Sequence, residues 1–424
     1  MGLTIAEKIL SRVSDRDIVR AGEEVMARPD FVISYDFPGY TDVVFRQMKE
    51  DFGIDKVPDP ERYAIFIDHM VPAATPAEEE LHIGTRQWCA DNEVALYERE
   101  GIGHQVSAEV GYATPGAFVV HFDGHISQLG TFGTLAIGIR RNILEAFVRE
   151  RISMRVPETV RLNLTGDLPP GVMARDVFHH MVARFGPAFA KFKVLELGGE
   201  GLNGISIEGR QSITCLAMFT GALTAIINPD RPTLDYALPR AKIDLEPLYS
   251  DPDASYADVL ELDVSSLEPI VVAPPTPADT KPLSQYKGLE INAGYIGSCA
   301  SGRLDDMRAA AAVLKGRKIK PGFALHVIPT SQKIMADAAA EGLIQTLVEA
   351  GAFVSSSSCD YCFGRIATMS PGQRAMSTGT LNVSGRMGSP DSEIYLGNAA
   401  SVAASALEGQ IADPRDYLPA DSKI

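Results

Sequence analysis

The sequence predicts an α/β protein whose sheets are largely parallel. Short apolar runs of strand length alternate with helical stretches along the chain, and 45% of its 424 residues are hydrophobic, which is enough for several cores. The expected strands cover 63–67, 118–121, 159–164, 193–197, 323–328 and 353–354. The expected helices cover 76–98, 134–151, 174–184, 211–227, 303–315 and 331–350.

Two further segments complete this prediction. Apolar positions in 4–28 follow a helical period that is broken near Ser14 and Asp15. In 273–284 four prolines, threonines and a charge pair replace the apolar periodicity, so we expect a linker. This linker would separate a long N-terminal part from a C-terminal domain at 285–424.

The composition argues against several function classes. The chain has 39 basic and 55 acidic residues, a formal net charge of −16, which disfavours binding to nucleic acid or to an anionic membrane. The most apolar stretches, such as 215–228 and 398–407, are shorter than the roughly 18–20 residues that span a bilayer. With five cysteines and no secretory signal evident, we expect reduced thiols in a cytoplasmic protein.

Three cysteines lie where metal ligands would be expected. Cys359 and Cys362 form a Cys-Asp-Tyr-Cys pair after an expected strand, and Cys299 lies between a short strand and a helix. Thiolates are soft ligands that iron–sulfur clusters and zinc prefer. The spacing alone leaves open a zinc half-site, a redox dithiol or buried thiols. The lack of an obvious fourth ligand favours a catalytic site with one open position, while Cys89 and Cys215 are expected to be core thiols.

A series of motifs in a fixed order covers nearly the whole chain. The motifs occupy 68–72 (Asp-His-Met-Val-Pro), 103–105 (Gly-His-Gln), 123–125 (Asp-Gly-His), 164–172, 297–318 around the first cysteine, and 357–415 around the other two. With these motifs the sequence resembles the aconitase superfamily, and within it the large subunits of the 3-isopropylmalate dehydratase and homoaconitase type. The resemblance implies three α/β/α domains around a central cluster cleft, at 1–160, 161–272 and 285–424, with 273–284 as linker.

The resemblance also implies roles for individual residues. Cys299, Cys359 and Cys362 would hold a [4Fe–4S] cluster whose fourth iron has no protein ligand and binds the substrate hydroxyl. The implied catalytic residues are Asp68, His69, His104, Asp123, His125 and Glu196, and Arg386 would bind a substrate carboxylate. For each of these the plainer alternative is a polar residue that caps a strand, fills a loop or lies at the surface. His82, His121, His179, His180 and His326 are expected to be structural.

Several positions differ from the usual family pattern, and they lie near the expected substrate. Beside the cysteines, the usual residues are replaced by Ala300, Ser301, Asp360 and Tyr361. Further back, Gly124 replaces a hydroxyl-bearing residue. Leu381 stands where a substrate-binding arginine is usual, so we expect a different substrate or substrate orientation. The arginine that is missing at this position could be compensated by Arg140, Arg141 or Arg365. The alternative is that these arginines belong to a solvated helix start or a subunit interface.

The resemblance therefore predicts an iron–sulfur hydro-lyase that reversibly dehydrates a hydroxylated di- or tricarboxylic acid. The family's final domain has no counterpart before the last residue, so a separate small subunit is expected as partner. Neither nucleic acid nor a membrane is expected as a partner. A cluster-bearing regulatory protein that binds RNA, and a zinc or dithiol protein using only Cys359 and Cys362, are the alternatives.

Overall fold

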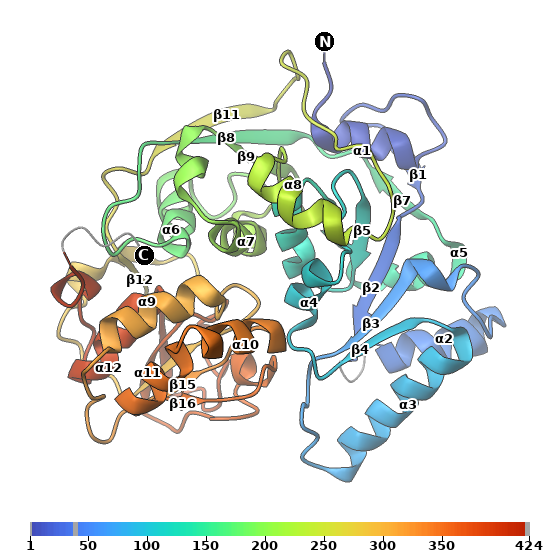
Figure 1. The fold of residues 1–424 in the computed structure, drawn as a ribbon. Helices are drawn as coiled ribbons and strands as arrows, with labels where there is room; N and C mark the ends of the chain where they lie inside the picture. Colours follow the sequence, from blue (N-terminus) through green and yellow to red (C-terminus); the bar gives the residue numbers. More distant parts are fainter. Residues whose placement is uncertain (1, 37–40, 420–424) are drawn as a thin grey trace.

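The computed structural model describes residues 2–36 and 41–419, which form three larger sheets and one two-stranded sheet (Figure 1). The first sheet is entirely parallel. In spatial order it consists of β4 (Ala95–Glu98), β3 (Tyr63–Ile67), β2 (Phe31–Tyr35), β5 (Phe118–His121) and β6 (Leu135–Gly138). Because β2, β3 and β5 are buried on both faces, their sequences are mostly apolar and do not alternate.

The second sheet is also parallel, whereas the third is mixed. The second consists of β10 (Thr224–Ile227), β9 (Val194–Gly198), β8 (Thr159–Thr165) and β11 (Asp258–Asp263). The third consists of β13 (Thr280–Pro282), β12 (Ile270–Val272), β18 (Glu393–Leu396), β17 (Arg374–Ser377), β14 (Ala293–Ile296), β15 (Ala324–Val327) and β16 (Phe353–Val354). A separate antiparallel pair joins β1 (Glu24–Ala27) to β7 (Ile152–Arg155). The predicted α/β class is confirmed.

Helices connect and cover the strands. They are α1 (Ile5–Val13), α2 (Thr41–Phe52), α3 (Pro76–Asn92), α4 (Gly103–Glu109), α5 (Ile143–Arg149), α6 (Ala174–Phe185), α7 (Ile207–Leu216), α8 (Arg231–Ala237), α9 (Leu304–Leu314), α10 (Gln332–Ala340), α11 (Leu343–Ala350) and α12 (Ala399–Glu408). In the C-terminal part, drawn in orange and red in Figure 1, α9 packs against α11 and α12. Within the described ranges, every helix is too short or too polar to span a bilayer.

Several predicted helices are wrong in part. The segment 134–151 contains β6, a 3-10 turn (Arg140–Asn142) and α5, and 211–227 contains the end of α7, a 3-10 turn (Ala217–Thr220) and β10. The predicted helix 76–98 ends at Asn92, before β4, and 331–350 is two helices divided at Gly342. In 4–28 only α1 is an α-helix, and β1 follows it. A short buried strand beside a helix has no periodicity of its own, so these pairs merged in the sequence pattern.

The proline-rich segment 273–284 is not an unstructured connection. It contains β13, which pairs with β12 and so extends the third sheet at its edge. The Ala273 N–H donates to the Asp279 carbonyl at 2.9 Å, which closes this hairpin. Prolines are tolerated here because an edge strand needs few of its N–H groups for the ladder. Residues 280–282 of this segment thus belong to the edge of the third sheet.

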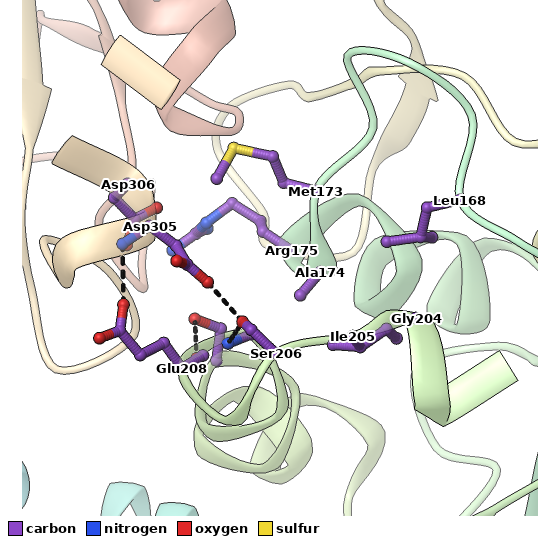
Figure 2. A pocket seen from close by; sticks show the side chains of 12 residues that line it. Leu168, Met173, Ala174, Arg175, Gly204, Ile205, Ser206, Glu208, Asp305 and Asp306 are labelled. Atoms are coloured by element: carbon purple, nitrogen blue, oxygen red, sulfur yellow. Dashed lines mark hydrogen bonds between the residues drawn. The ribbon is translucent and has the colours of Figure 1, made fainter. Parts of the chain in front are cut away.

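A cavity of about 230 Å³ lies where α6, α7 and α9 meet (Figure 2). Its lining combines apolar residues from α6 and the preceding turn with charged groups of α6, α7 and α9. The charged groups are Arg175, Glu208, Asp305 and Asp306. Elements of the second and third sheets therefore approach one another directly at this point.

Candidate active site

The carboxyl ends of the first sheet carry most of the predicted catalytic residues. Asp68 and His69 follow β3, His104 lies in the first turn of α4 beyond β4, and Asp123 and His125 follow β5. In a parallel sheet all carboxyl ends lie at one edge, which is where α/β proteins build their sites. The chain thus brings two acid–histidine pairs and a further histidine to a single edge.

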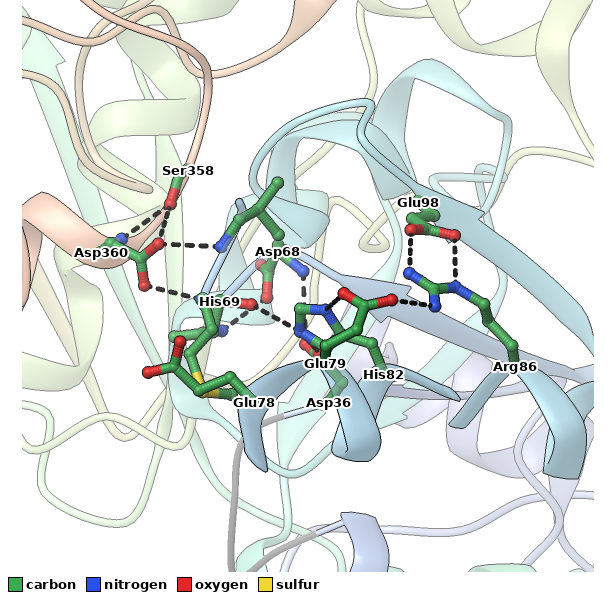
Figure 3. A network of polar contacts seen from close by, with 12 residues as sticks. Asp36, Asp68, His69, Glu78, Glu79, His82, Arg86, Glu98, Ser358 and Asp360 are labelled. Atoms are coloured by element: carbon green, nitrogen blue, oxygen red, sulfur yellow. Dashed lines mark hydrogen bonds and ion pairs between the residues drawn. The ribbon is translucent and has the colours of Figure 1, made fainter. Parts of the chain in front are cut away.

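Asp68 and His69 form a buried pair (Figure 3). His69 Nδ1 lies 2.6 Å from Asp68 Oδ1, and the Gly103 N–H donates to Asp68 Oδ2 at 2.7 Å. Burial opposes the charge of each group, but the partner outweighs it, so the pKa of His69 is raised and the pKa of Asp68 is lowered. This arrangement favours a protonated imidazole beside a carboxylate.

Asp123 and His125 form the second pair. Asp123 Oδ1 lies 2.8 Å from His125 Nδ1 and also accepts the His125 N–H at 2.7 Å. Burial opposes protonation of His125, but the negative charge of Cys299 and of Asp123 outweighs it and raises the pKa of His125 to about 10. His125 is therefore a cation that points toward the cysteines, and its Nε2 is buried without a hydrogen-bond partner in the described structure.

His104 and His121 remain neutral beside these pairs. Burial lowers the pKa of His104, whose Nε2 lies 3.9 Å from Asp123 Oδ1 and has no hydrogen-bond partner among the described residues. Burial and the nearby His104 lower the pKa of His121 to about 3, and His121 Nδ1 accepts the Asp123 N–H at 2.8 Å. His121 thus orders the Asp123 loop, in agreement with the structural role predicted for it.

The three predicted metal ligands come from the third sheet. Cys299 follows β14, while Cys359 and Cys362 flank the start and end of a 3-10 turn that follows β16. The thiols of Cys359 and Cys362 hydrogen-bond to each other, and this contact, followed by burial, raises the pKa of Cys359. The same contact, together with Arg386, lowers the pKa of Cys362. Cys299 interacts electrostatically with Cys359, with Arg386 and with His125.

Arg386 contacts the cysteines directly. Its Nη2 donates to Cys362 Sγ at 3.1 Å, and the charge of Cys362 raises the pKa of Arg386. Its Nε is buried without a hydrogen-bond partner in the described residues. The guanidinium therefore has donors left for a ligand while one donor stabilises a thiolate.

These residues fit an iron–sulfur cluster. Three soft thiol ligands converge, and two cations, Arg386 and His125, lie beside them to balance an anionic group. Imidazole nitrogens of His104 and His125 are buried without hydrogen-bond partners in the described structure, which is what a site for a further polar group requires. Cys359 and Cys362 come from the turn after β16 and Cys299 from the loop after β14, so the set offers three thiol ligands.

The two halves of the site are joined by the cysteine loop. The Cys359 N–H donates to the Asp68 carbonyl at 3.0 Å. Asp360, which is fully buried, accepts the N–H groups of Met70 and Val71 at 2.7 and 3.0 Å (Figure 3). These contacts hold the loop of Cys359 and Cys362 next to the Asp68–His69 pair. The unusual Asp360 thus holds the loop together.

Three arginines are candidates to replace the substrate-binding arginine that is absent at Leu381, and each has different surroundings. Arg365 pairs with Glu78 at 2.5 Å and with Asp360 at 3.3 Å, so carboxylates of the chain already bind it. Arg140 is exposed, and its N–H donates to the Phe122 carbonyl, one residue before Asp123. Arg141 belongs to the same 3-10 turn, and its side chain lies outside the described structure.

Glu196 lies in the second sheet, whereas the other predicted catalytic residues follow strands of the first. It is fully buried in β9, where its carboxylate accepts hydrogen bonds from four side chains of the second sheet and its surroundings. The donors are Arg161 at 2.6 Å, Asn228 at 2.6 Å, Ser250 at 2.8 Å and Tyr256 at 3.1 Å. Both carboxylate oxygens of Glu196 thus already have hydrogen-bond partners.

Sequence reasoning missed three residues at the site. Tyr35 ends β2, and its ring lies 5.0 Å from that of His69 and 5.1 Å from that of His121. Arg303 is fully buried and donates to the Cys299 carbonyl at 2.7 Å. Cys215, expected to be a core thiol, hydrogen-bonds to Cys299. Arg303 stands in the same motif as Cys299, which was a usable signal, whereas Tyr35 and Cys215 had none.

Comparisons with known proteins agree with this geometry. A model of the aconitase family (aconitate hydratase) matches residues 7–409. The 3-isopropylmalate dehydratase large subunit 1 of Methanopyrus kandleri is 38% identical over 422 residues, which is 99% of this chain and 100% of that protein. The large subunit of the same enzyme from Aquifex aeolicus is 37% identical over 431 residues, or 100% of this chain and 99% of that one.

A solved structure, the holo form of Thermococcus kodakaraensis aconitase X, covers 89% of both chains with 11% sequence identity. Its TM-score of 0.48 is too low to support an argument. The family assignment depends instead on the full-length sequence matches and on the family model. On these matches, the chain belongs to the aconitase family.

Proposed function

We propose that the chain is the cluster-binding large subunit of a hydro-lyase that reversibly dehydrates a hydroxylated di- or tricarboxylic acid, of the 3-isopropylmalate dehydratase type. The observation that carries this proposal is the junction between the cysteine loop and the first sheet. Through it, Cys359 donates its N–H to the carbonyl of Asp68, so cluster ligands and the Asp68–His69 pair lie side by side. The names of the full-length relatives support the same reaction class.

When bound by Cys299, Cys359 and Cys362, a [4Fe–4S] cluster supplies a Lewis-acidic iron for the substrate hydroxyl. His69 delivers a proton to the departing hydroxyl oxygen, and Asp68 orients the imidazole through Nδ1 and favours its protonated form. His125, held cationic by Asp123 and by the thiolates, stabilises negative charge next to the cluster. His104 remains neutral and offers its unpartnered Nε2 to the substrate.

The substrate contacts follow from the arginine positions. Arg386 binds one carboxylate with the donors that do not contact Cys362. Leu381 is partly buried and offers no charge, and Arg365 is already paired with Glu78 and Asp360. A second carboxylate opposite Leu381 would lose its hydration without gaining a partner. We therefore propose a substrate that presents an apolar or small group toward Leu381.

A separate small subunit is the proposed partner, because the relatives are named as large subunits and the chain spans their full length. Nothing in the described structure favours RNA binding, and the net charge of −16 opposes it. A cytoplasmic location is part of this proposal, because the full-length relatives are named as enzymes that act on a small acid.

The experiment starts with anaerobic reconstitution using iron and sulfide, followed by mixing with the separately produced small subunit. We expect a brown protein that converts a 3-isopropylmalate-type acid to an unsaturated acid, measured by its ultraviolet absorbance. A panel of acids should vary the group that faces Leu381. A colourless protein that retains only zinc, or no conversion by the reconstituted pair on any acid, would contradict the proposal.

A ligand variant and a matched control make the cluster assignment specific. Cys362→Ser should lose cluster iron while it remains folded, because it removes a thiolate that Arg386 stabilises. Cys89→Ser is the control, because Cys89 is a buried thiol in α3, away from the cluster residues. Equal iron content in Cys362→Ser and wild type would reject Cys362 as a ligand.

A further inference from the structure

A second acid–histidine pair lies beside the Asp68–His69 pair (Figure 3). Asp36 follows β2 and is fully buried, and His82 in α3 is 3% exposed. Asp36 Oδ2 lies 2.9 Å from His82 Nε2, so the two side chains form an ion pair. One oxygen of Asp36, one oxygen of Asp68 and one ring nitrogen of His69 lie within 4.8 Å of one another. The two pairs are therefore immediate neighbours.

The second pair holds the backbone of the first at two points. Asp36 Oδ1 accepts the Asp68 N–H at 3.3 Å. His82 Nε2 donates to the His69 carbonyl at 3.2 Å. The first bond lies at the start of the Asp68–His69 dipeptide and the second lies at its end. One ion pair thus fixes both ends of the dipeptide whose side chains were predicted to be catalytic.

The turn after β3 needs such contacts because its backbone conformation is not favoured locally. Met70 directly follows His69 and has a φ of 54°, in the left-handed region that residues with a side chain rarely adopt. Asp360 of the cysteine loop accepts the Met70 N–H at 2.7 Å. Asp36 and His82 hold the preceding two residues from β2 and α3. His69 is thus fixed both by the cysteine loop and by elements of the first sheet.

Charged neighbours at both ring nitrogens orient the His82 imidazole. Its Nε2 lies beside Asp36, and its Nδ1 lies 3.8 Å from Glu79 Oε2. Arg86 donates to the other oxygen of Glu79 at 2.8 Å and pairs with Glu98 of β4 at 2.6 Å. The hydrogen bond to Asp36 outweighs burial and raises the pKa of His82. A histidine that only filled space would not need a carboxylate at each nitrogen.

We propose that Asp36 and His82 are positioning residues for His69, which together hold the Asp68–His69 backbone so that the His69 imidazole meets the departing hydroxyl oxygen. Neither residue touches the substrate, so both act on the rate of proton delivery and not on substrate affinity. Displacing a reacting group by about 1 Å can lower a rate about a hundred-fold. The inference rests on the role given to His69 under the proposed function.

The test measures kcat and KM of the complex that is reconstituted anaerobically with the small subunit, for an acid that wild type converts. His82→Leu removes the donor to the His69 carbonyl and the cation beside Asp36. We expect kcat per cluster to fall about ten- to a hundred-fold while KM changes less than about two-fold. His82→Gln keeps an N–H donor near the position of Nε2 and should recover most of kcat.

Asp36→Asn is the second variant, because it keeps the size of the carboxylate and removes its charge. It should lower kcat per cluster in the same direction, and it decides the question if His82→Leu does not fold. Iron per chain and urea midpoints are measured for every variant. Loss of folding or of cluster lowers the total activity but leaves kcat per cluster unchanged, so these measurements separate a positioning role from a purely structural one.

His180→Leu is the matched control, since His180 on α6 also contacts a backbone carbonyl through Nε2, that of Glu268 at 2.9 Å. It should leave kcat near wild type. A kcat per cluster in the folded His82 and Asp36 variants equal to that of the control would overturn the positioning role and leave the proposed function intact. So would a His82→Gln variant no more active than His82→Leu. A wild-type complex that converts no acid overturns the proposed function, and this inference with it.

Discussion

At the scale of single residues, Asp360 shows how one carboxylate holds two distant loops in place. Its Oδ1 accepts the Met70 N–H, and its Oδ2 accepts the Val71 N–H and the Ser358 hydroxyl at 2.7 Å. The charge is fully buried and is balanced in part by Arg365. A buried carboxylate with this many donors is costly to alter, because every change leaves a donor unpaired.

We predict that Asp360→Asn lowers the free energy of unfolding by about 2–4 kcal/mol. The NH2 group of the asparagine must face at least one N–H or hydroxyl donor, and two donors cannot form a hydrogen bond with each other. Urea unfolding of the reconstituted chain measures this change. The exposed Asp391→Asn is the control and should change the free energy by less than about 0.5 kcal/mol. Equal midpoints for the two variants would contradict the role given to Asp360.

Glu208 leads to a prediction about pH. Burial, followed by the nearby Asp305 carboxylate, raises the pKa of Glu208 from 4.5 to about 7. Because this folded-state pKa is raised, the folded chain binds the proton more tightly than the unfolded chain does. The stability that the proton contributes is present below pH 4.5 and is lost as the pH rises toward 7.

Glu208→Gln should therefore gain stability relative to wild type as the pH rises from 5 to 8, by about 1–3 kcal/mol. Its amide oxygen can still accept the Asp305 N–H, which now donates to Glu208 Oε2 at 2.8 Å. Urea midpoints at the two pH values measure the effect, with the exposed Glu261→Gln as control. A pH-independent difference would show that Glu208 ionises as an ordinary surface carboxyl.

At the scale of elements, the carboxyl end of β6 approaches the loop after β5 so closely that only glycine fits there. A Cβ at Gly138, the last residue of β6, would lie 2.6 Å from the Gly124 Cα. Gly124 in turn stands between Asp123 and His125. The backbone contact between these strand ends thus fixes the loop that carries the second acid–histidine pair.

Gly138→Ala should displace this loop and destabilise the chain by about 1–3 kcal/mol, because the clash is with backbone rather than with a flexible side chain. Gly84→Ala is the matched control, since Gly84 lies in α3 with nothing within 4 Å of the added carbon. It should stabilise the helix by about 0.5–1 kcal/mol. Thermal unfolding compares the two, and opposite signs are expected.

At the scale of the whole molecule, Arg303 ties all three larger sheets together at the site. It donates to Gln105 at 2.8 Å and to Gln128 beyond strands of the first sheet, to Ser212 at 3.2 Å in α7, and to the Cys299 carbonyl. The side chain is completely buried, so its bonds to neutral acceptors replace all of its hydration. The relative placement of the three sheets therefore depends on one guanidinium.

Arg303→Met should lower the free energy of unfolding by about 3–5 kcal/mol, because it leaves several buried acceptors without a donor. Arg308→Met, in α9, removes only half-exposed ion pairs with Glu341 and Asp305 and should cost at most about 1 kcal/mol. Urea unfolding measures both. Similar losses in the two variants would reject the connecting role of Arg303.

The sequence by itself determined the α/β class, several strands to the residue, and the convergence of Cys299, Cys359 and Cys362 after their strands. Strands such as β3 and β16 were predictable because a short apolar run bounded by turns is a local signal. The short strands β4, β6 and β10 were not, because each follows or precedes a helix without a break in apolar character.

Only the tertiary structure decided which polar residues meet. The bond between Asp360 and Met70 joins residues 290 positions apart, and no local pattern encodes it. Glu196 matched a family role but lies among donors of the second sheet, while Cys215 matched a core thiol but lies against Cys299. The physical reason is that periodicity reports which face of an element is buried, whereas a site depends on how separate elements pack against one another.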